Sequence, residues 1–241
     1  MRVAVLISGE PRFSKEFDIF LENLTGFDQV DWYFYLWNNG VYALENKLMP
    51  PSWFNIDHNT AYDKIRLNLP PDHNIAYLEL ADQNKTQFPN IQERLGWAVK
   101  QDNVWKMWYG WYQVDSKCHD DYDMVIKSRP DLALVHPVNL KEITFSSNEL
   151  LLPNNYGGFY NNNHICDLMA ISSRSNIRVY NSIFNHAEQY HRQGYMFHPE
   201  TLLSKHLDEH GIKYRKGNFN VEYRYFGKTD NKYQIQYERW I

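Results

Sequence analysis

The feature that most constrains the fold is a strand, a helix and a second strand that follow one another at the start of the chain. Residues 2–8 have the unbroken apolar, β-branched character of a strand buried on both faces. Residues 17–24 carry apolar side chains at helical spacing, and Ser14 is a good N-cap for that helix. The run "VDWYFYLWNN" then predicts another buried strand. Such a unit implies parallel strands joined by a right-handed crossover.

The rest of the chain continues this alternation and contains no repeat or linker. Further strands are predicted at residues 75–80, 124–127 and 132–135, and helices at residues 90–117, 175–191 and from Pro199 to just before Gly211. The sequence therefore predicts an α/β fold, Rossmann-like, with a mostly parallel central sheet flanked by helices. We expect residues 1–241 to form a single domain.

Composition limits the classes of function. The 241 residues, 43% of them hydrophobic, are enough for a packed core. The 25 Lys and Arg residues against 29 Asp and Glu residues give a formal net charge of -4. A chain with this balance has no overall field that would attract nucleic acid or an anionic membrane, so we expect no nucleic-acid partner and only a local anion site.

The cysteine content and the lack of long apolar runs indicate the cellular compartment in which the protein is expected. Cys118 and Cys166 lie far apart without metal-ligand spacing, which favours ordinary buried thiols in a reducing compartment. The N-terminal apolar run is too short for a signal peptide, and no run approaches the roughly 20 residues of a transmembrane helix. We therefore expect a soluble, cytoplasmic protein, in the host cytoplasm if the source is viral.

Ligand sites in open α/β sheets lie at the carboxyl ends of the strands, so the residues after each predicted strand are the first candidates. In "SGEPR", Ser8 and Gly9 leave room for a ligand to approach the backbone, and Arg12 could hold a phosphate bidentately. The alternative is a tight turn with a surface arginine. Asn38 follows the second strand, where it is either a turn residue or a ligand contact.

The stretch "YDMVIKSRPDLAL" runs a buried strand into a cluster of charge: Lys127, Arg129 and Asp131. A carboxylate at this position could bind Mn²⁺ or Mg²⁺, because these ions prefer hard oxygen ligands. Pro130 fixes its own φ and so holds its two charged neighbours in a defined relative pose. The alternative is that Arg129 and Asp131 simply pair with each other at the strand end.

Five segments together resemble a known family. In order they are "ISGEPRF", "DWYFYLWN", "YDMVIKSRPDLAL", "CDLMAISSRSNIRVY" and "HPETLLSKHL". They resemble the "SGQxR", "HTW", "RxRxD", "NDQ" to "A(F/I)GS" and "PE" motifs of small GT-A-type glycosyltransferases found in bacterial polysaccharide loci and in large phages and viruses. The resemblance covers nearly the whole chain and is weakest in the middle third. The order of the motifs is its specific part.

This resemblance implies an enzyme that transfers a hexose from a UDP-sugar to a glycan or another hydroxyl acceptor, with Mn²⁺ or Mg²⁺ bridging the donor diphosphate. Asp131 would be the metal carboxylate, because "RPD" stands where this fold usually has "DxD". Arg129 replaces the first acidic position and could neutralise the diphosphate directly. Ser8, Gly9 and Arg12 would line the nucleotide pocket.

The same resemblance suggests the catalytic residues. Asp167 matches the "NDQ" segment and is a candidate for the sugar or acceptor hydroxyls, or else a turn carboxylate. Glu200 could deprotonate the acceptor, as inversion requires, although an acidic residue is also favourable in the first turn of a helix. His198 could bind the metal or be a structural histidine. Arg12, Arg129 or Lys127 would stabilise the leaving diphosphate.

Two other functions remain open on the sequence. One is a non-catalytic protein that binds a nucleotide sugar or carbohydrate, which the arginine in the acidic motif favours. The other is a nucleotidyltransferase, which would share the metal carboxylate and the nucleotide pocket. The short, lysine-poor loop "SGEPRF" argues against the second, because that class usually has a glycine-rich basic loop after its first strand.

Overall fold

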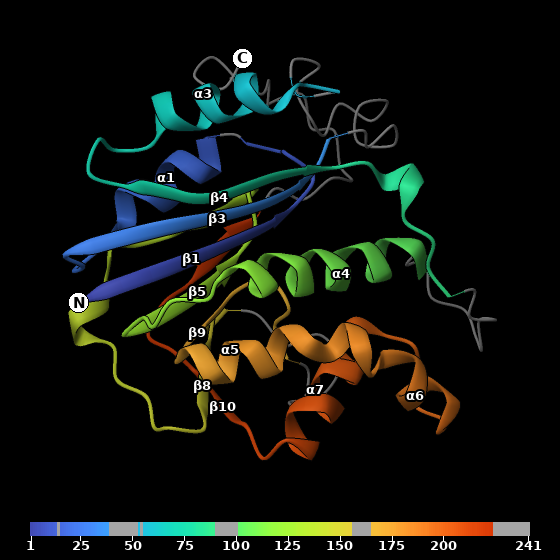
Figure 1. Cartoon of the computed structure of the whole chain (residues 1–241). Helices are drawn as coiled ribbons and strands as arrows, with labels where there is room; N and C mark the ends of the chain where they lie inside the picture. The colour runs from blue at the N-terminus through green and yellow to red at the C-terminus, as the bar shows by residue number, and fades with distance from the viewer. Residues whose placement is uncertain (14, 39–52, 54, 90–100, 156–164, 224–241) are drawn as a thin grey trace, which may run out of the picture.

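The computed structural model describes residues 1–13, 15–38, 53, 55–89, 101–155 and 165–223. Seven strands form the central sheet: β1 (Arg2–Gly9), β3 (Gln29–Trp37), β4 (Asn74–Ala81), β5 (Met124–Ser128), β8 (Glu149–Leu152), β9 (Ala170–Ser172) and β10 (Lys213–Lys216). The helices of the described residues are α1 (Lys15–Asn23), α3 (His58–Asn68), α4 (Gln101–Lys117), α5 (Arg174–Asn181), α6 (Ala187–Arg192) and α7 (Pro199–Glu209). Figure 1 shows helices on both sides of the sheet, as an α/β fold requires.

Shorter elements complete the described chain. Two small ladders pair β2 (Leu24–Thr25) with β7 (Val138–Asn139), and β6 (Leu132–Leu134) with β11 (Val221–Tyr223). Three 3₁₀ helices are η2 (Gln83–Lys85), η3 (Leu140–Glu142) and η4 (Ser182–Asn185). The strands expected at residues 75–80, 124–127 and 132–135 correspond to β4, β5 and β6, which confirms these predictions within a residue or two.

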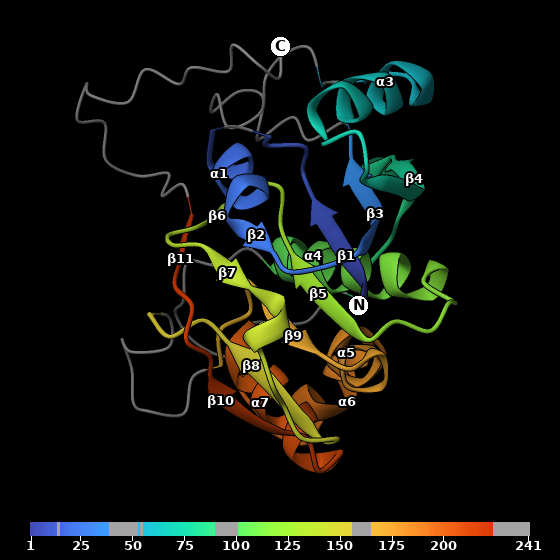
Figure 2. The same cartoon turned by 90° about the vertical axis from the view of Figure 1, so that its left-hand side faces the viewer.

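The sheet has the order β10-β8-β9-β5-β1-β3-β4. The strands β4, β3, β1 and β5 are mutually parallel, whereas β9 runs antiparallel to both β5 and β8. The predicted mostly parallel sheet is therefore confirmed. From β1 the chain builds outward to β3 and β4, and then returns through α4 to place β5 on the other side of β1 (Figure 2). This reversal makes a topological switch point between β1 and β5.

Alternating aromatic side chains of β3 explain why helices cover both faces. Trp32 packs against Phe17 of α1, with ring centroids 5.9 Å apart. Tyr35 has the opposite side-chain parity and packs against Tyr109 of α4 at 6.1 Å. Because successive strand residues point to opposite faces, β3 contributes apolar surface to two layers at once. This agrees with its nearly continuous burial.

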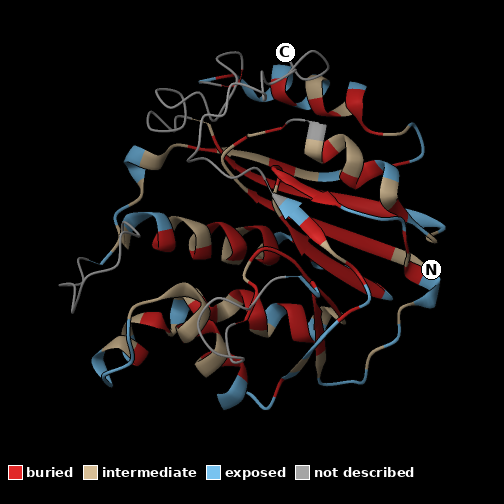
Figure 3. Ribbon diagram, turned by 180° about the vertical axis from the view of Figure 1, so that it is seen from behind, coloured by how far each residue is buried: buried red, intermediate tan, exposed pale blue. Residues whose placement is uncertain are grey.

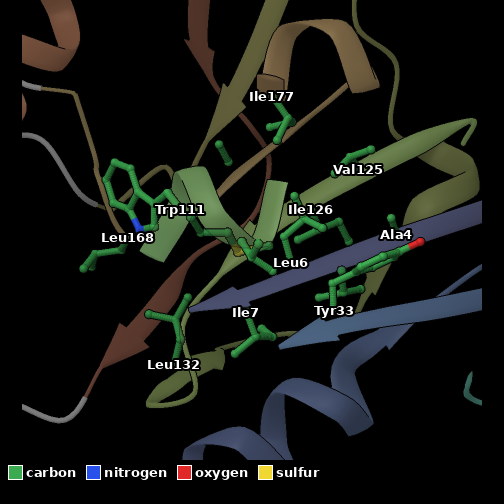
Figure 4. Close-up of a cluster of buried hydrophobic side chains, with 14 of the residues drawn as sticks. Ala4, Leu6, Ile7, Tyr33, Trp111, Val125, Ile126, Leu132, Leu168 and Ile177 are labelled. Carbon is green, nitrogen blue, oxygen red and sulfur yellow. The ribbon is translucent and has the colours of Figure 1, made fainter. Parts of the chain in front are cut away.

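The core follows the central strands. Residues 3–7 of β1 are completely buried, and Figure 3 shows that burial follows the sheet while the outer faces of the helices are exposed. Figure 4 shows Ile7 and Leu132 within this buried cluster, and Trp111 and Leu168 at one end of it. Both thiols, Cys118 and Cys166, are buried as expected. Burial raises the pKa of Cys118 to about 11 and that of Cys166 to about 12, so both remain thiols at neutral pH.

The second half of the chain differs from the prediction in one respect. The single helix expected at residues 175–191 is interrupted: α5 ends at Asn181 and is followed by η4 and α6. At the break, the Ser182 hydroxyl donates to the Val179 carbonyl at 2.8 Å and competes with the helical ladder. The following helix is as predicted, since α7 has Pro199 in its first turn and Gly211, with a φ of 67°, just past its end.

Some predictions fall outside the described residues, namely the N-cap at Ser14, residues 90–100 of the long helix and residues 156–164 of the polar loop. The helix α3 was not predicted; its N-cap, Asp57, accepts a hydrogen bond from the Thr60 amide at 3.0 Å.

None of the described helices combines the length and the apolar character that crossing a membrane would need.

Candidate functional site

The carboxyl ends of β1, β3, β4 and β5 meet at one edge of the sheet because these four strands are parallel. Polar side chains from three elements are joined at this edge. Gln83, just after β4, donates to Glu10 after β1 at 3.5 Å, and it accepts from Lys106 of α4 at 3.0 Å. A chain of polar contacts thus crosses the edge where an open α/β sheet binds its ligand.

Two arginines and two carboxylates lie at the switch point itself. Arg129 makes a bidentate pair with Asp131, with Nε–Oδ1 and Nη2–Oδ2 distances of 2.8 and 2.7 Å. Arg12 donates from both Nε and Nη2 to a single oxygen of Glu10, Oε2, and its Nη1 lies 3.6 Å from Oδ2 of Asp131. We call these four residues the switch-point cluster. Its formal charges cancel, and its two guanidinium groups meet around one buried carboxylate.

Backbone conformation brings this cluster together. Gly9 ends β1 with a φ of 139°, which L side chains rarely adopt, and a Cβ added there would lie 3.6 Å from Cδ of Pro130. The turn after β1 therefore favours glycine at this position. Ser8 is 5% exposed, and its Oγ would lie 3.4 Å from a Cβ at Gly110 of α4. Its side chain packs against the helix, so the predicted nucleotide contact of Ser8 would have to come from its backbone.

Asp131 is ionised in this arrangement although it is only 1% exposed. Burial acts to raise its pKa, but the charge and hydrogen bonds of Arg129, together with Arg12, hold the pKa below its usual value. Both carboxylate oxygens already accept from Arg129. A divalent cation would have to displace that guanidinium and tolerate a second one nearby. Within the described residues, Asp131 therefore does not form a site that fits Mn²⁺ or Mg²⁺.

Lys127 has a different surrounding from the one predicted. Its Nζ donates to the carbonyl oxygens of Asp167 and Leu168, the latter at 3.3 Å, and lies 3.6 Å from the ring centroid of Trp111. The side chain is 1% exposed, and burial lowers its pKa to about 7. Lys127 thus holds residues 167 and 168 against β5 instead of facing a phosphate at the edge.

The two predicted catalytic carboxylates come together. Burial first, and then the charge of Asp167, raises the pKa of Glu200 to about 7. Glu200 stands in the first turn of α7, whereas Asp167 precedes β9 on the segment held by Lys127. The charges of Asp167, Arg129 and Asp131 all act on the pKa of Lys127, so Asp167 and two residues of the switch-point cluster lie close to one ammonium group.

The remaining predicted residues have local roles. Asn38 donates from Nδ2 to the Ile56 carbonyl at 2.8 Å and accepts from the Asn55 amide, which fits the turn interpretation. His198 is the residue before α7, and its carbonyl accepts the Leu202 amide at 3.0 Å. In the part of the chain that the structure describes, the group of side chains that could hold a metal contains neither Asp131 nor His198.

Sequence reasoning missed part of this site. Glu10 was quoted within "SGEPR" but was not singled out, and Gln83 and Lys106 lie in segments whose pattern gave no functional signal. For Glu10 a signal exists: a carboxylate two residues before Arg12 is placed to pair with it. Gln83 and Lys106 come to the edge only through the tertiary fold.

In comparisons with known proteins, no family model matches the chain and no curated protein sequence matches it.

Proposed function

We propose that the chain is a glycosyltransferase of the GT-A type that moves a hexose from a UDP-sugar to a hydroxyl group of a glycan or a smaller acceptor. One observation carries the proposal: Glu200, a carboxylate with a pKa near neutrality, is close enough to Asp167 to be affected by its charge, and Asp167 and Arg129 both act on the buried ammonium group of Lys127. Glycosyl transfer needs a base for the acceptor and cations for the leaving group.

The leaving diphosphate would be bound by the switch-point cluster. Arg12 and Arg129 are 19% and 25% exposed, so their guanidinium groups reach the surface, whereas Asp131 does not. A diphosphate can accept the bidentate pair of hydrogen bonds that Arg129 now donates to Asp131. Binding would exchange carboxylate partners for phosphate partners. The proposal involves no metal, because the described residues around Asp131 do not fit one.

The reaction can be written with the residues of the chain. The acceptor oxygen attacks the anomeric carbon, and its proton passes to the carboxylate of Glu200. The bond from the anomeric carbon to the diphosphate oxygen breaks, and its electron pair leaves with the diphosphate, whose charge Arg12 and Arg129 neutralise. A base with a pKa near 7 is half ionised at neutral pH, which suits this role. Asp167 would bind a sugar or acceptor hydroxyl and keep that pKa high.

A second candidate, a non-catalytic nucleotide-sugar binder, is favoured by one specific observation. The charges of the switch-point cluster already cancel in the absence of a ligand. Such pairing is also what a purely structural ion-pair network would show. Donor binding without turnover would support this candidate.

The test is a panel of nucleoside diphosphate sugars in thermal-shift and donor-hydrolysis assays, each with and without EDTA. Binding to the native state raises the apparent melting temperature by mass action. We expect a UDP-sugar to raise Tm equally in both conditions and to be slowly hydrolysed. A shift that EDTA abolishes would restore the expected Mn²⁺ or Mg²⁺. The absence of a shift with every donor would refute the proposed function.

A further inference from the structure

Three histidine rings meet on the helical layer that contains α6 and α7. His186, His206 and His210 each offer a ring nitrogen within 4.8 Å of the others. Their ring centroids are 4.4 Å apart for His206 and His210, 4.9 Å for His186 and His206, and 5.5 Å for His186 and His210. We call these residues the histidine cluster. It is separate from the residues assigned to the proposed glycosyl transfer.

The fold brings the cluster together from two elements. His206 and His210 are four residues apart at the end of α7, so their side chains lie on one face of that helix. His186 stands at the junction of η4 and α6, where the break in the predicted long helix redirects the chain toward α7. A continuous helix over residues 175–191 would not have this junction. The interruption of the helix thus places the imidazole of His186 close to those of His206 and His210.

Hydrogen bonds hold the rings in orientations suitable for metal ligands. His206 Nε2 lies 2.8 Å from the Val179 carbonyl oxygen, which makes it the donor and leaves Nδ1 with a lone pair. His210 Nδ1 lies 2.8 Å from the carbonyl oxygen of His206, so its Nε2 carries the lone pair. Histidines that bind metal ions typically donate their other ring N–H to a carbonyl or carboxylate in this way.

The hydroxyl of Tyr190 donates a hydrogen bond to Nδ1 of His206 at 2.9 Å, so the nitrogen that would bind a metal ion already has a partner. The hydroxyl has a second acceptor available. Glu209 is within hydrogen-bonding reach of the same hydroxyl, which can therefore donate to that carboxylate instead. Glu209 also brings a negative charge close to His206 and His186. Once Tyr190 donates to Glu209, Nδ1 of His206 can bind a cation, and the carboxylate of Glu209 lies close to that cation.

We propose that the histidine cluster binds one Zn²⁺ ion through three imidazole nitrogens, with the fourth position open to water or to Glu209. Zn–N bonds of about 2.0 to 2.1 Å place the nitrogens of a tetrahedral site about 3.3 Å apart, so the rings need to close by about 1.5 Å at most. His186 is half-buried and His210 is exposed, which leaves these two free to make that movement. The bound ion would connect the start of α6 to the end of α7.

The ligand type sets the expected selectivity. Three nitrogen ligands suit Zn²⁺, Cu²⁺ and Ni²⁺, whereas Mg²⁺ requires oxygen ligands. Zinc in this cluster would also differ from the divalent ion expected at a donor diphosphate. This proposal does not depend on the proposed glycosyl transfer, and either can fail without the other.

The test is zinc binding to the untagged, full-length protein by isothermal titration calorimetry, with metal content after dialysis measured by mass spectrometry. We expect one Zn²⁺ per chain and no heat with Mg²⁺. His210→Ala, at an exposed position, should fold normally and weaken zinc binding at least tenfold. The matched control is His119→Asn, which changes an exposed histidine outside the cluster and should bind zinc like the wild type.

A second measurement addresses the geometry. Co²⁺ substituted for Zn²⁺ should give the intense visible absorption of a tetrahedral site, and His186→Ala should remove it. Zinc should also raise Tm of the wild type and leave Tm of His210→Ala unchanged. Zinc binding that is equal in wild type and His210→Ala, or stoichiometric binding lost only in the His119→Asn control, would overturn the proposal. The absence of zinc binding to the wild type would overturn it as well.

Discussion

Arg129 and Asp131 face each other across Pro130 through two hydrogen bonds, of 2.8 and 2.7 Å, at the point where β5 ends. Pro130 has a fixed φ, which restricts how its two neighbours can be oriented relative to each other. The carboxylate of Asp131 is almost completely buried. This short-range pair therefore fixes the direction in which the guanidinium points.

Asp131→Asn should destabilise the fold, because it leaves Arg129 without its ionic partner beside a buried amide. Removing one partner of a buried pair costs about 3 to 5 kcal/mol, and partial exposure of Arg129 reduces this to about 2 to 3 kcal/mol. Urea unfolding measures the change, with Asp120→Asn as the exposed control. Since the pKa of Asp131 is lowered, its stabilising effect should be full above pH 4 and lost on further acidification. A loss equal to that of the control would contradict a structural pair.

Arg12→Gln should weaken donor binding while leaving the fold intact. Loss of a charge-assisted hydrogen bond costs about 1.5 to 3 kcal/mol, or roughly ten- to a hundredfold in Kd. Arg178→Gln is the matched control, because that arginine is 62% exposed on α5. Calorimetric titration with the stabilising UDP-sugar compares the two variants. An unchanged Kd for Arg12→Gln would remove this arginine from the donor site.

Glu200→Gln should abolish turnover and preserve donor affinity, because a base acts on the acceptor only during the reaction. General base catalysis contributes about a hundred- to ten-thousandfold. Wild-type kcat should rise with pH through about 7, as the carboxylate loses its proton. Asp167→Asn should move this rise to lower pH, since it removes a negative neighbour. Glu142→Gln, on exposed η3, should behave as wild type, and full activity of Glu200→Gln would place the base elsewhere.

Lys127→Met should change how stability depends on pH. Burial lowers the folded-state pKa of Lys127 to about 7, below its ordinary value of 10.5, so the unfolded chain binds more protons between these values. The contribution of Lys127 to stability should therefore be most favourable above pH 10.5 and become less favourable toward pH 7, by at most about 1.4 kcal/mol per pH unit. The variant should lose this slope, measured against exposed Lys141→Met by urea unfolding. Parallel curves for wild type and Lys127→Met would mean that Lys127 titrates normally.

Gly9→Ala should cost more stability than Gly211→Ala. A φ of 139° at Gly9 lies where L residues are strained, whereas the φ of 67° at Gly211 lies in the left-handed region, which L residues reach at a smaller cost, and an added methyl there has open space around it. We expect about 2 to 3 kcal/mol for the first and about 1 kcal/mol for the second. Thermal unfolding of both variants gives the comparison. Equal losses would show that the turn after β1 is not strained.

The sequence predicted the elements whose signals are local. Residues 2–8 and 124–127 are buried on both faces, so their apolar runs are unbroken whichever way the chain turns next. Pro199 and Gly211 similarly mark both ends of α7. The break after Asn181 could not be predicted from the sequence. A serine side chain that donates to a carbonyl one turn earlier, as Ser182 does, occurs both within helices and in turns, and only the packing decides between them.

Long-range relationships account for what the sequence did not reveal at the site. Lys127 belongs to a charged segment, and only the fold shows that its ammonium is enclosed by Trp111 and two carbonyl oxygens. His206 and His210 have a recognisable four-residue spacing, but His186 is twenty residues earlier and joins them through helix packing. The meeting of Asp167 with Glu200 also depends on two distant elements.

The central pairing of β1 with β5 has a consequence for synthesis of the protein. Val3 pairs with Met124, so more than half of the chain must be synthesised before β5, one of the two neighbours of β1, is present. Pairing over such a separation slows folding, and an unpaired apolar strand edge invites association with other chains. During translation β1 can pair with β3 early, but its other edge stays open until residue 128 has left the ribosome. A fragment that ends before β5 should therefore be prone to aggregation.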